Sequence, residues 1–400
     1  MLRKTRSTPL SLTRFIYLYQ QQRAVRQLGT KPSNRCTHKN KDDDKKIHSP
    51  IKHQEDYIFF HKSKGQHILT NQRVLDSIVR KSSINPDDTV LEIGPGTGNL
   101  TLKLLEVSKK VHAIEIDERM VEILNRRAAD SGFHDRLNVI SKDALKTEFP
   151  QFDLVVANIP YGISSPLVAK LVYGTKSFRS ATLLLQKEFA RRLLASPGDS
   201  EFNRLAVNVK LVADVEFVMD VSKRDFLPCP KVDSSVVIIR PKAEIPDVNL
   251  DEWRAFTRTC FSKKNKTLGA TFKQKKKVIE LLRLSKQKGP NTENFVSDDG
   301  CHSGEDDDDE EASGVDDLCS SSCSEMEMSL FKEKITQVLK SAAFEDKRPC
   351  KLSNEELLHL LSLFNQVGIY FHDKTVPNNA DDAAAAAAAA YSSQQQFPFV

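Results

Sequence analysis

The sequence predicts an α/β protein, with a doubly wound, mostly parallel sheet of seven strands followed by a smaller helical domain. Three observations carry this prediction. Short apolar runs alternate with helix-length amphipathic patterns between residues 57 and 245. A turn with three alternate glycines follows the first of these runs, as happens where a parallel strand leads into a helix around a ligand. Beyond Pro246 the pattern becomes helical.

The parallel part of the sheet is expected from five short apolar runs, which helix-length patterns separate. These strands are expected over residues 89–93, 110–116, 137–141, 154–158 and 181–186. The intervening helices are expected over residues 97–107, 118–130 and 164–173. Two later runs, 215–221 and 235–240, are expected to form an antiparallel hairpin at the sheet edge. The sheet domain therefore spans residues 57–245.

The helical domain is expected over residues 246–375, with helices over 250–260, 266–284, 329–341 and 353–365. Its first part is basic, because 12 Lys or Arg residues lie between Asp251 and Lys288. Such residues on a helical surface bind phosphate and give affinity without sequence choice. The alternative is an ordinary solvated helix face. We therefore expect this domain to bind RNA.

An acidic segment interrupts the helical domain over residues 289–328. It is rich in Asp, Glu, Ser and Gly and contains no Lys or Arg, so we expect a disordered, solvated insert. The net charge of +5 for the whole chain therefore hides a more basic remainder, which suits a polyanionic partner. A sharper alternative is that the insert mimics nucleic acid.

The two ends of the chain differ from the body. The first 41 residues contain ten Lys or Arg and no acid, and apolar residues between Phe15 and Val25 share one helical face. These features are typical of a mitochondrial presequence, which we expect within residues 1–45 together with a linker. A basic RNA-binding arm or nucleolar signal is the alternative. Residues 376–400 form a low-complexity tail with eight consecutive alanines.

Cysteine and hydropathy patterns exclude other classes. The seven cysteines are scattered, which favours reduced thiols in an intracellular compartment. Cys319 and Cys323 have loose metal-ligand spacing, but no second ligand pair accompanies them, so no metal is expected. No run of 18 apolar residues exists, so the sequence predicts neither a membrane-spanning helix nor a membrane partner.

The glycine turn and a later carboxylate together indicate a nucleoside site. Gly94, Gly96 and Gly98 follow the first strand, and glycine allows both positive φ and close backbone approach to a ligand. Glu115 ends the next strand, where a carboxylate can accept bonds from ribose hydroxyls. The pair fits a dinucleotide or S-adenosylmethionine, although the third glycine comes one residue early for the dinucleotide fingerprint.

Two further strand ends carry polar groups. Asp143 follows the third strand and could accept an adenine amino group, although such an Asp is more often a helix cap. The tetrapeptide Asn158-Ile159-Pro160-Tyr161 follows the fourth strand and combines an amide, a fixed backbone and an aromatic face. These groups suit a grip on the exocyclic amine of a flat base, whereas alone the tetrapeptide would more often be a turn.

In this order the motifs resemble the class I S-adenosylmethionine-dependent methyltransferases, which have a Rossmann-like seven-stranded sheet. More closely, the chain resembles the ribosomal RNA adenine dimethyltransferases, in particular an organelle-targeted, plant-like member of the eukaryotic branch. The resemblance covers residues 62 to 373. Its motifs are Lys64-Gly65-Gln66-His67-Ile68-Leu69, Glu92-Ile93-Gly94-Pro95-Gly96-Thr97-Gly98, Glu115-Ile116-Asp117, Asn158-Ile159-Pro160-Tyr161 and Phe226-Leu227-Pro228-Cys229-Pro230-Lys231-Val232-Asp233-Ser234.

The resemblance implies roles for individual residues. It implies that the cofactor, S-adenosylmethionine, contacts His67, Leu69, Gly94, Gly96, Glu115, Asp143 and Asn158. It implies that the target adenine is held by Asn158, Pro160 and Tyr161, with Phe226 as the second aromatic face. Without the resemblance, Phe226 would be interpreted as a core residue and His67 as an ordinary satisfied histidine.

The resemblance also implies the reaction and the partner. The expected activity is N6-dimethylation of two adjacent adenosines near the 3′ end of small-subunit rRNA, within a pre-ribosomal particle, by a monomer without metal. The presequence favours mitochondrial rRNA, with the nucleolus and cytosolic-ribosome rRNA as the alternative. Three other hypotheses remain open: an NAD-dependent oxidoreductase, a non-catalytic ribosome-assembly factor and a mitochondrial transcription factor.

Overall fold

The computed structural model describes residues 67–287 and 324–372. By its contacts the chain divides into two units, residues 1–58 and 59–400, and everything below concerns the second. The predicted presequence, most of the acidic insert, the Cys319–Cys323 pair and the alanine-rich tail therefore lie outside the described residues.

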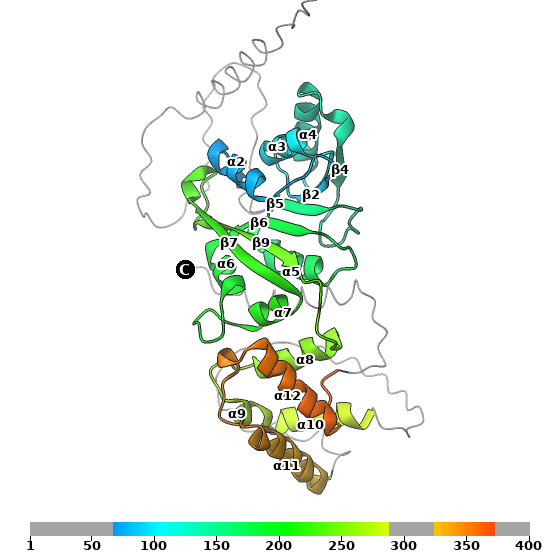
Figure 1. The fold of residues 1–400 in the computed structure, drawn as a ribbon, viewed down its shortest axis with the longest axis vertical. Coiled ribbons are helices and arrows are strands. Elements are labelled where there is room, and N and C mark those ends of the chain that lie inside the picture. The colour runs from blue at the N-terminus through cyan, green and yellow to red at the C-terminus, as the bar shows by residue number, and fades with distance from the viewer. Residues whose placement is uncertain (1–66, 288–323, 373–400) are drawn as a thin grey trace, which may run out of the picture. The chain divides into compact units, whose positions relative to one another are not determined.

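The centre of the fold is a seven-stranded sheet with the order β4-β3-β2-β5-β6-β9-β7 (Figure 1). The first five strands in this order run parallel, and β9 runs antiparallel to both β6 and β7. The predicted doubly wound sheet with an antiparallel edge is therefore confirmed. The strands are β2 (Thr89–Ile93), β3 (Lys110–Glu115), β4 (Leu137–Ser141), β5 (Leu154–Asn158), β6 (Ser180–Gln186), β7 (Ala213–Val221) and β9 (Ser234–Pro241).

Helices cover both faces of this sheet, which is why its central strands are continuous apolar runs. In β5, Leu154 to Ala157 are at most 1% exposed. One face packs against apolar residues of α2 and α3, and the other against residues of α5, α6 and α7. The helices of this part are α2 (Gln72–Lys81), α3 (Asn99–Val107), α4 (Glu118–Asp130), α5 (Ser164–Tyr173), α6 (Lys187–Leu194) and α7 (Arg204–Val212).

The predicted boundaries in the sheet domain hold to within two residues, and the shift at the start of α3 has a physical cause. Helix α3 begins at Asn99, two residues later than expected, because Gly98 is its N-cap in the left-handed region with φ of 86°. Helix α4 matches the prediction, and Asp117 caps it by accepting a hydrogen bond from the Arg119 backbone N–H. Helices α2, α6 and α7 are additional to the predicted elements.

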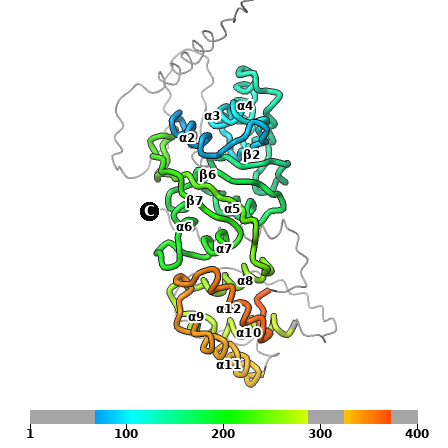
Figure 2. Tube along the Cα trace, in the orientation of Figure 1, coloured from blue at the N-terminus to red at the C-terminus, as the bar shows by residue number. Residues whose placement is uncertain are grey.

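A second sheet, not predicted, joins two distant segments. It pairs β1 (Ile68–Leu69) with β8 (Phe226–Leu227) in antiparallel register. The side chain of Asn71 also donates to Asp225 at 2.8 Å, so the blue segment at the start of the described chain runs beside the green segment that carries β8 (Figure 2). Two-residue strands lack a periodic signal, which is why the sequence did not reveal them.

The connection from β4 to β5 is unusual for a parallel sheet. It spans residues 142–153, passes β3 and β2, and contains no helix. Phe149 and Phe152 belong to this segment and are buried against the sheet face that α5 also covers. The segment therefore covers part of that sheet face where a crossover helix would usually lie.

The C-terminal part is helical, as predicted. Its helices are α8 (Leu250–Cys260), α9 (Leu268–Phe272), α10 (Lys275–Gln287), α11 (Glu325–Ser341) and α12 (Asn354–Gln366). The single helix expected over 266–284 is wrong, because the chain breaks at Lys273 between α9 and α10. Helix α11 begins four residues early, capped by Ser324, so the last residues of the predicted acidic insert are helical.

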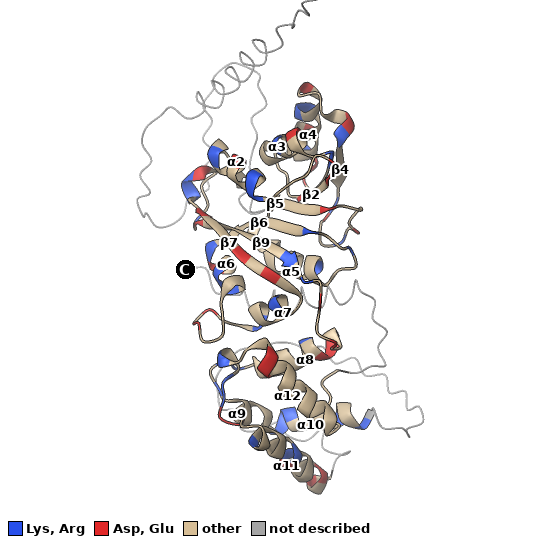
Figure 3. Cartoon of the chain, viewed as in Figure 1, with Lys and Arg blue, Asp and Glu red and all other residues tan. Residues whose placement is uncertain are grey.

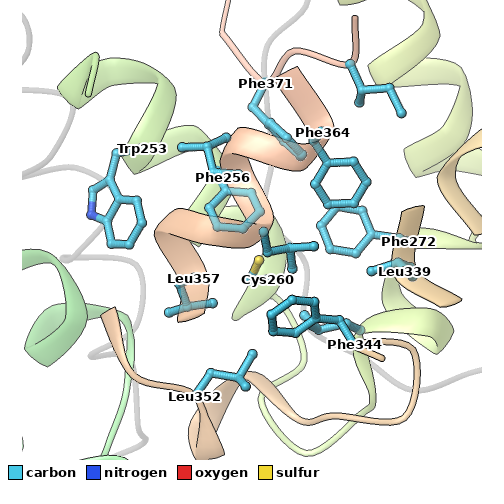
Figure 4. Packing of buried hydrophobic residues seen from close by; sticks show 14 of the residues in the cluster. Trp253, Phe256, Cys260, Phe272, Leu339, Phe344, Leu352, Leu357, Phe364 and Phe371 are labelled. Atoms are coloured by element: carbon cyan, nitrogen blue, oxygen red, sulfur yellow. The ribbon is translucent and has the colours of Figure 1, made fainter. Parts of the chain in front are cut away.

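These helices enclose an aromatic core with Trp253, Phe256, Phe272 and Phe364, each fully buried (Figure 4). Residues of α7, including Val207 and Leu211, belong to the same hydrophobic cluster. The helical part thus shares its core with the last helix before the sheet edge. Within the described ranges, no helix combines the length and apolar character needed to cross a bilayer.

Candidate active site

A pocket opens at the carboxyl ends of β2, β3 and β5, where open α/β sheets bind ligands. Its lining includes residues 67–69, the turn after β2, the end of β3 and residues 158–161, together with side chains from β2, α2, α3 and α4. Most of the residues predicted for the site, namely His67, Leu69, Gly94, Gly96, Glu115, Asn158, Pro160 and Tyr161, are therefore brought together around one cavity.

The glycine turn has the backbone that the sequence predicts. Gly94, Gly96 and Gly98 have φ of 68°, 56° and 86°, a region that other residues enter at a cost of about 1 kcal/mol or more. A Cβ atom at Gly94 would lie 3.1 Å from Pro160 Cδ, and one at Gly98 would lie 2.5 Å from Leu124 Cδ1. The turn therefore needs glycine both for its conformation and for close packing against the neighbouring segments.

Glu115 is fixed by three backbone donors. Its Oε2 accepts from the Gly96 N–H at 3.1 Å, and its Oε1 accepts from the N–H groups of Ile116 and Asp117 at 3.0 Å each. Burial raises the pKa of this carboxyl, and the three N–H donors oppose that rise. Asp117 is instead committed to capping α4 and to an ion pair with Arg119. Of the two acids, Glu115 is the one that faces the pocket.

Glu92 is a site residue that the sequence interpretation did not single out. It is 1% exposed, lines the pocket, and its Oε2 has no hydrogen-bond partner among the described residues. Burial raises its pKa to about 8, and the nearby Glu115 carboxylate adds to the rise. The available signal was an acidic residue two positions before Gly94, in a largely apolar strand.

The side chain of Asn158 has a defined orientation. Its Nδ2 donates to the backbone carbonyl of His67 at 3.1 Å, so the amide oxygen Oδ1 points to the other side of the amide plane. The following Ile159 N–H donates to Leu184 O at 3.3 Å on the adjacent strand. The Pro160 carbonyl already accepts from Ile163 N–H at 3.1 Å. Asn158 Oδ1 and the Ile159 carbonyl are the acceptors that these bonds leave available.

Tyr161 is held from two sides. Its hydroxyl bonds Ser234 Oγ at 2.8 Å, and burial raises its pKa. Its ring stacks on the His67 ring, with 5.9 Å between centroids and 28° between planes. The His67 Nδ1 lies 2.8 Å from the Pro228 carbonyl, which can only accept, so Nδ1 carries a proton. His67 thus links the cofactor segment, Tyr161 and the loop after β8.

Two predicted site residues do not line this pocket. Phe226 is 4% exposed and packs in the hydrophobic cluster with Leu69, its partner in the β1–β8 pair. Side chains of paired residues share one face, so Ile68 and the exposed Leu227 occupy the opposite face. Asp143 is half-buried, and its Oδ1 accepts from the Leu145 N–H at 2.9 Å, as in a cap.

The described ranges contain no group of three or more His, Cys, Asp or Glu residues that could hold a metal ion. Cys229 and Cys350 have free thiols, as does the buried Cys260, where burial raises the pKa well above its usual value.

A protein-family model described as "Ribosomal RNA adenine dimethylase" matches residues 59–299. These residues include the whole pocket and all seven strands of the main sheet. The match therefore covers more than half of the chain and every motif that the sequence analysis used.

Individual relatives agree with this match. The chain is 62% identical over 349 residues to an Arabidopsis thaliana protein named "Ribosomal RNA small subunit methyltransferase, mitochondrial", covering 87% of this chain and 90% of that protein. It is 44% identical over 310 residues to a "Probable dimethyladenosine transferase" of Dictyostelium discoideum, covering 78% and 90%. Its structure is similar to the crystal structure of a Plasmodium falciparum dimethyladenosine transferase, with a TM-score of 0.63 at 39% identity, covering 76% and 100%.

Proposed function

Because the chain belongs to the ribosomal RNA adenine dimethylase family, we propose that it methylates N6 of two adjacent adenosines near the 3′ end of mitochondrial small-subunit rRNA. It is an rRNA adenine N6,N6-dimethyltransferase. The mitochondrial location is supported by the name of the Arabidopsis relative and by the Arg-rich, acid-free first 41 residues. The role of the enzyme is in rRNA modification during ribosome biogenesis.

The pocket fits S-adenosylmethionine as the methyl donor. The glycine turn forms a cradle that a Cβ would fill, and Glu115 is oriented by backbone donors to accept ribose hydroxyls. Asp143 does not line the pocket itself, but its Oδ1 is held by the Leu145 N–H, and we propose that its second carboxylate oxygen accepts the adenine amino group. His67 and Leu69 close the pocket from the β1 side. When bound, the cofactor supplies an electrophilic methyl group on a sulfonium.

The orientation of Asn158 carries the proposal most directly. The N6 nitrogen of adenine is a poor nucleophile because its lone pair is delocalised into the ring. Since Asn158 Nδ2 is used by the His67 carbonyl, Oδ1 is free to accept one N6–H bond, and the Ile159 carbonyl can accept the other. Two such acceptors hold the amine and favour a tetrahedral nitrogen, whose lone pair can attack the methyl in line.

The remaining groups position the base. Tyr161 offers an aromatic face for an extruded adenine, and its bond to Ser234 fixes the ring. Pro160 fixes the backbone φ before this ring. Phe226 supports the loop from behind, since its buried ring packs on the core side of β8. A second methylation needs only one N–H acceptor, because N6-methyladenosine retains a single amine hydrogen.

The helical part supplies a surface for rRNA phosphate. Four of its lysines are paired with carboxylates, in Lys273–Glu345, Lys277–Glu280, Lys286–Glu327 and Lys347–Glu356. The exposed basic residues that form no ion pair within the described ranges include several on α10 (Figure 3); among them are Arg258, Lys263, Lys266, Lys275, Lys276 and Arg283. Unpaired cations release counterions from RNA on binding and position a pre-ribosomal particle.

The test is to map the product in both compartments. Purified full-length protein with tritiated S-adenosylmethionine is expected to label small-subunit rRNA at adjacent adenosines, and loss of the protein is expected to remove dimethyladenosine from mitochondrial rRNA only. Loss from cytosolic rRNA would assign the activity to the nucleolar pathway. Unchanged dimethyladenosine in both rRNAs would overturn the proposal.

A further inference from the structure

The crossing segment between β4 and β5 has an unusual backbone requirement. Residues 142–153 cross a sheet face without a helix, so their carbonyl groups need hydrogen-bond donors from elsewhere. The segment begins with a tight turn, in which Asp143 O accepts from the N–H groups of Lys146 and Thr147 at 3.1 and 2.9 Å. The carbonyls that follow this turn belong to no strand or helix, so no regular backbone ladder supplies N–H donors to them.

Lys170 on α5 supplies the missing donors. Its Nζ donates to the carbonyls of Ala144, Leu145 and Thr147 at 3.2, 2.8 and 2.7 Å. An ammonium has three N–H donors, and these three carbonyls can use all of them. The same nitrogen lies 4.6 Å from the centroid of the Phe149 ring, which stabilises the cation further.

This arrangement connects the two ends of the active site. Asp143 is the first residue of the turn, and its carboxylate is held by the Leu145 N–H, whose own carbonyl is bound by Lys170. Helix α5 follows directly on the segment that contains Asn158 and Tyr161. The ammonium of Lys170 therefore joins the turn that presents Asp143 to the helix behind the proposed adenine-binding residues.

We propose that Lys170 is a positioning residue for the cofactor: by binding three carbonyls of the crossing segment, it holds the Asp143 carboxylate where it accepts the 6-amino group of the cofactor adenine. The inference rests on the proposed function, because it needs an adenosyl cofactor at Asp143. Lys170 does not line the pocket. Its effect is therefore confined to the affinity and base selectivity of the cofactor site.

The experiment measures how much the 6-amino group contributes to binding. Calorimetry compares S-adenosylhomocysteine with S-inosylhomocysteine, in which oxygen replaces that amino group, on the full-length protein. Wild type is expected to favour the adenosyl ligand by about tenfold or more, as for a hydrogen bond to a charged group. Lys170→Met removes all three donors, and we expect the preference to fall to about twofold or less. The maximal rate at saturating S-adenosylmethionine is expected to stay near wild type.

A matched control contacts the same crossing segment. Lys176→Met breaks the more exposed pair of Lys176 with Glu148, at 3.5 Å, without touching the carbonyls, and is expected to keep the wild-type preference. If Lys170→Met fails to fold, Lys170→Gln replaces it, because the shorter, uncharged amide cannot reach all three carbonyls. The same loss of preference for the adenosyl ligand is then expected. A wild-type preference retained in a folded Lys170 variant would overturn the inference. If the wild-type protein binds the two ligands with nearly equal affinity, the role of Asp143 in the proposed function is overturned instead.

Discussion

The two halves of the active-site pocket are built in different ways. The cofactor half consists of the glycine turn and Glu115, whose bonding groups lie 19 residues apart and meet because β2 and β3 are adjacent parallel strands. The adenine half depends on contacts of much longer range. His67 meets Asn158 across 91 residues and Pro228 across 161, and Tyr161 meets Ser234 across 73.

This difference separates two kinds of rigidity. In the cofactor half, backbone N–H groups and strand ends fix the site, so single side chains matter mainly through their volume or charge. In the adenine half, side-chain hydrogen bonds hold the reacting groups, so removal of one polar atom changes the geometry directly. We expect substitutions in the adenine half to lower the rate of transfer, and substitutions in the cofactor half to change affinity and stability.

The largest effect is expected for Asn158→Ala. It removes the proposed acceptor for the adenine amine, so kcat is expected to fall by about 100-fold or more, a typical loss for one transition-state hydrogen-bonding group. Cofactor affinity is expected to change only a few-fold, measured by calorimetry. Asn138→Ala is the control, because Asn138 bonds His112 on β3 away from the pocket. An Asn158→Ala protein with full transfer activity would remove the chemical basis of the adenine half.

Glu92→Gln tests how a buried carboxyl in the cofactor half affects the stability of the fold. The folded protein keeps a proton on Glu92 up to a pKa of about 8, whereas the unfolded chain releases it near pH 4.5. The folded state binds more protons in this window, so its free energy of unfolding falls as pH rises. Between pH 5.5 and 7.5 the free energy of unfolding is expected to fall by about 3 kcal/mol because of Glu92. Glu92→Gln is expected to abolish this fall.

Urea denaturation at these two pH values, without ligand, measures the effect. The control is Glu106→Gln, which changes an exposed glutamate on the neighbouring α3 and is expected to leave the pH dependence as in wild type. An identical pH dependence in Glu92→Gln and wild type would mean that Glu92 is ionised in the folded protein.

Gly94→Ala tests the point at which the two halves touch. Its new Cβ would lie 3.1 Å from Pro160 Cδ, so the turn or Pro160, two residues after Asn158, must shift. We expect cofactor affinity to fall about tenfold, in line with the cost of αL strain plus a close contact, and kcat to fall as well. Gly132→Ala is the matched control, with φ of 74° and no atom within 4 Å of the added Cβ.

Gly132→Ala is expected to destabilise the fold by about 1 kcal/mol through strain alone, with unchanged cofactor affinity and rate. If Gly94→Ala lowers affinity while kcat stays at the wild-type value, the two halves are mechanically independent. A common loss supports the coupling through Pro160.

The smallest effect is expected for Tyr161→Phe. The ring remains, but the 2.8 Å bond to Ser234 is lost, and one net hydrogen bond is worth about 1 kcal/mol, or about fivefold. We expect this loss in kcat/KM for rRNA and none in cofactor affinity. Ser234→Ala is expected to give a similar loss, and the double variant little more. Additive losses would show that the two hydroxyls act separately.

The sequence predicted the cofactor half well because its signals are local. The strands over 89–93, 137–141 and 154–158 match residue for residue, and the glycine turn with Glu115 meets at one pocket. The carboxyl ends of parallel strands lie at one edge of the sheet whatever the conformation of the loops. Periodicity plus turn chemistry therefore suffices to predict such a site.

Other features depended on pairing that sequence patterns do not reveal. The β1–β8 register puts Leu69 and Phe226 on the core face, and two-residue strands give no alternation from which to predict it. The break between α9 and α10 was missed because residues 266–284 have a nearly continuous helical pattern. The local sequence does not reveal the role of Lys170, since its three carbonyl partners belong to a different segment.

The helical part is assembled from two stretches of chain, 250–287 and 324–372. Glu252 near the start of the first stretch accepts the N–H bonds of Phe371 and His372 at the end of the second, at 2.8 and 3.0 Å. Lys286 and Glu327 join the facing ends of the two stretches at 2.9 Å. A break in the intervening peptide would thus leave two polypeptides that recognise each other through a complete core. Expressed from separate genes, such fragments would make methylation depend on their encounter, and the enzyme would become a two-component reporter of molecular proximity.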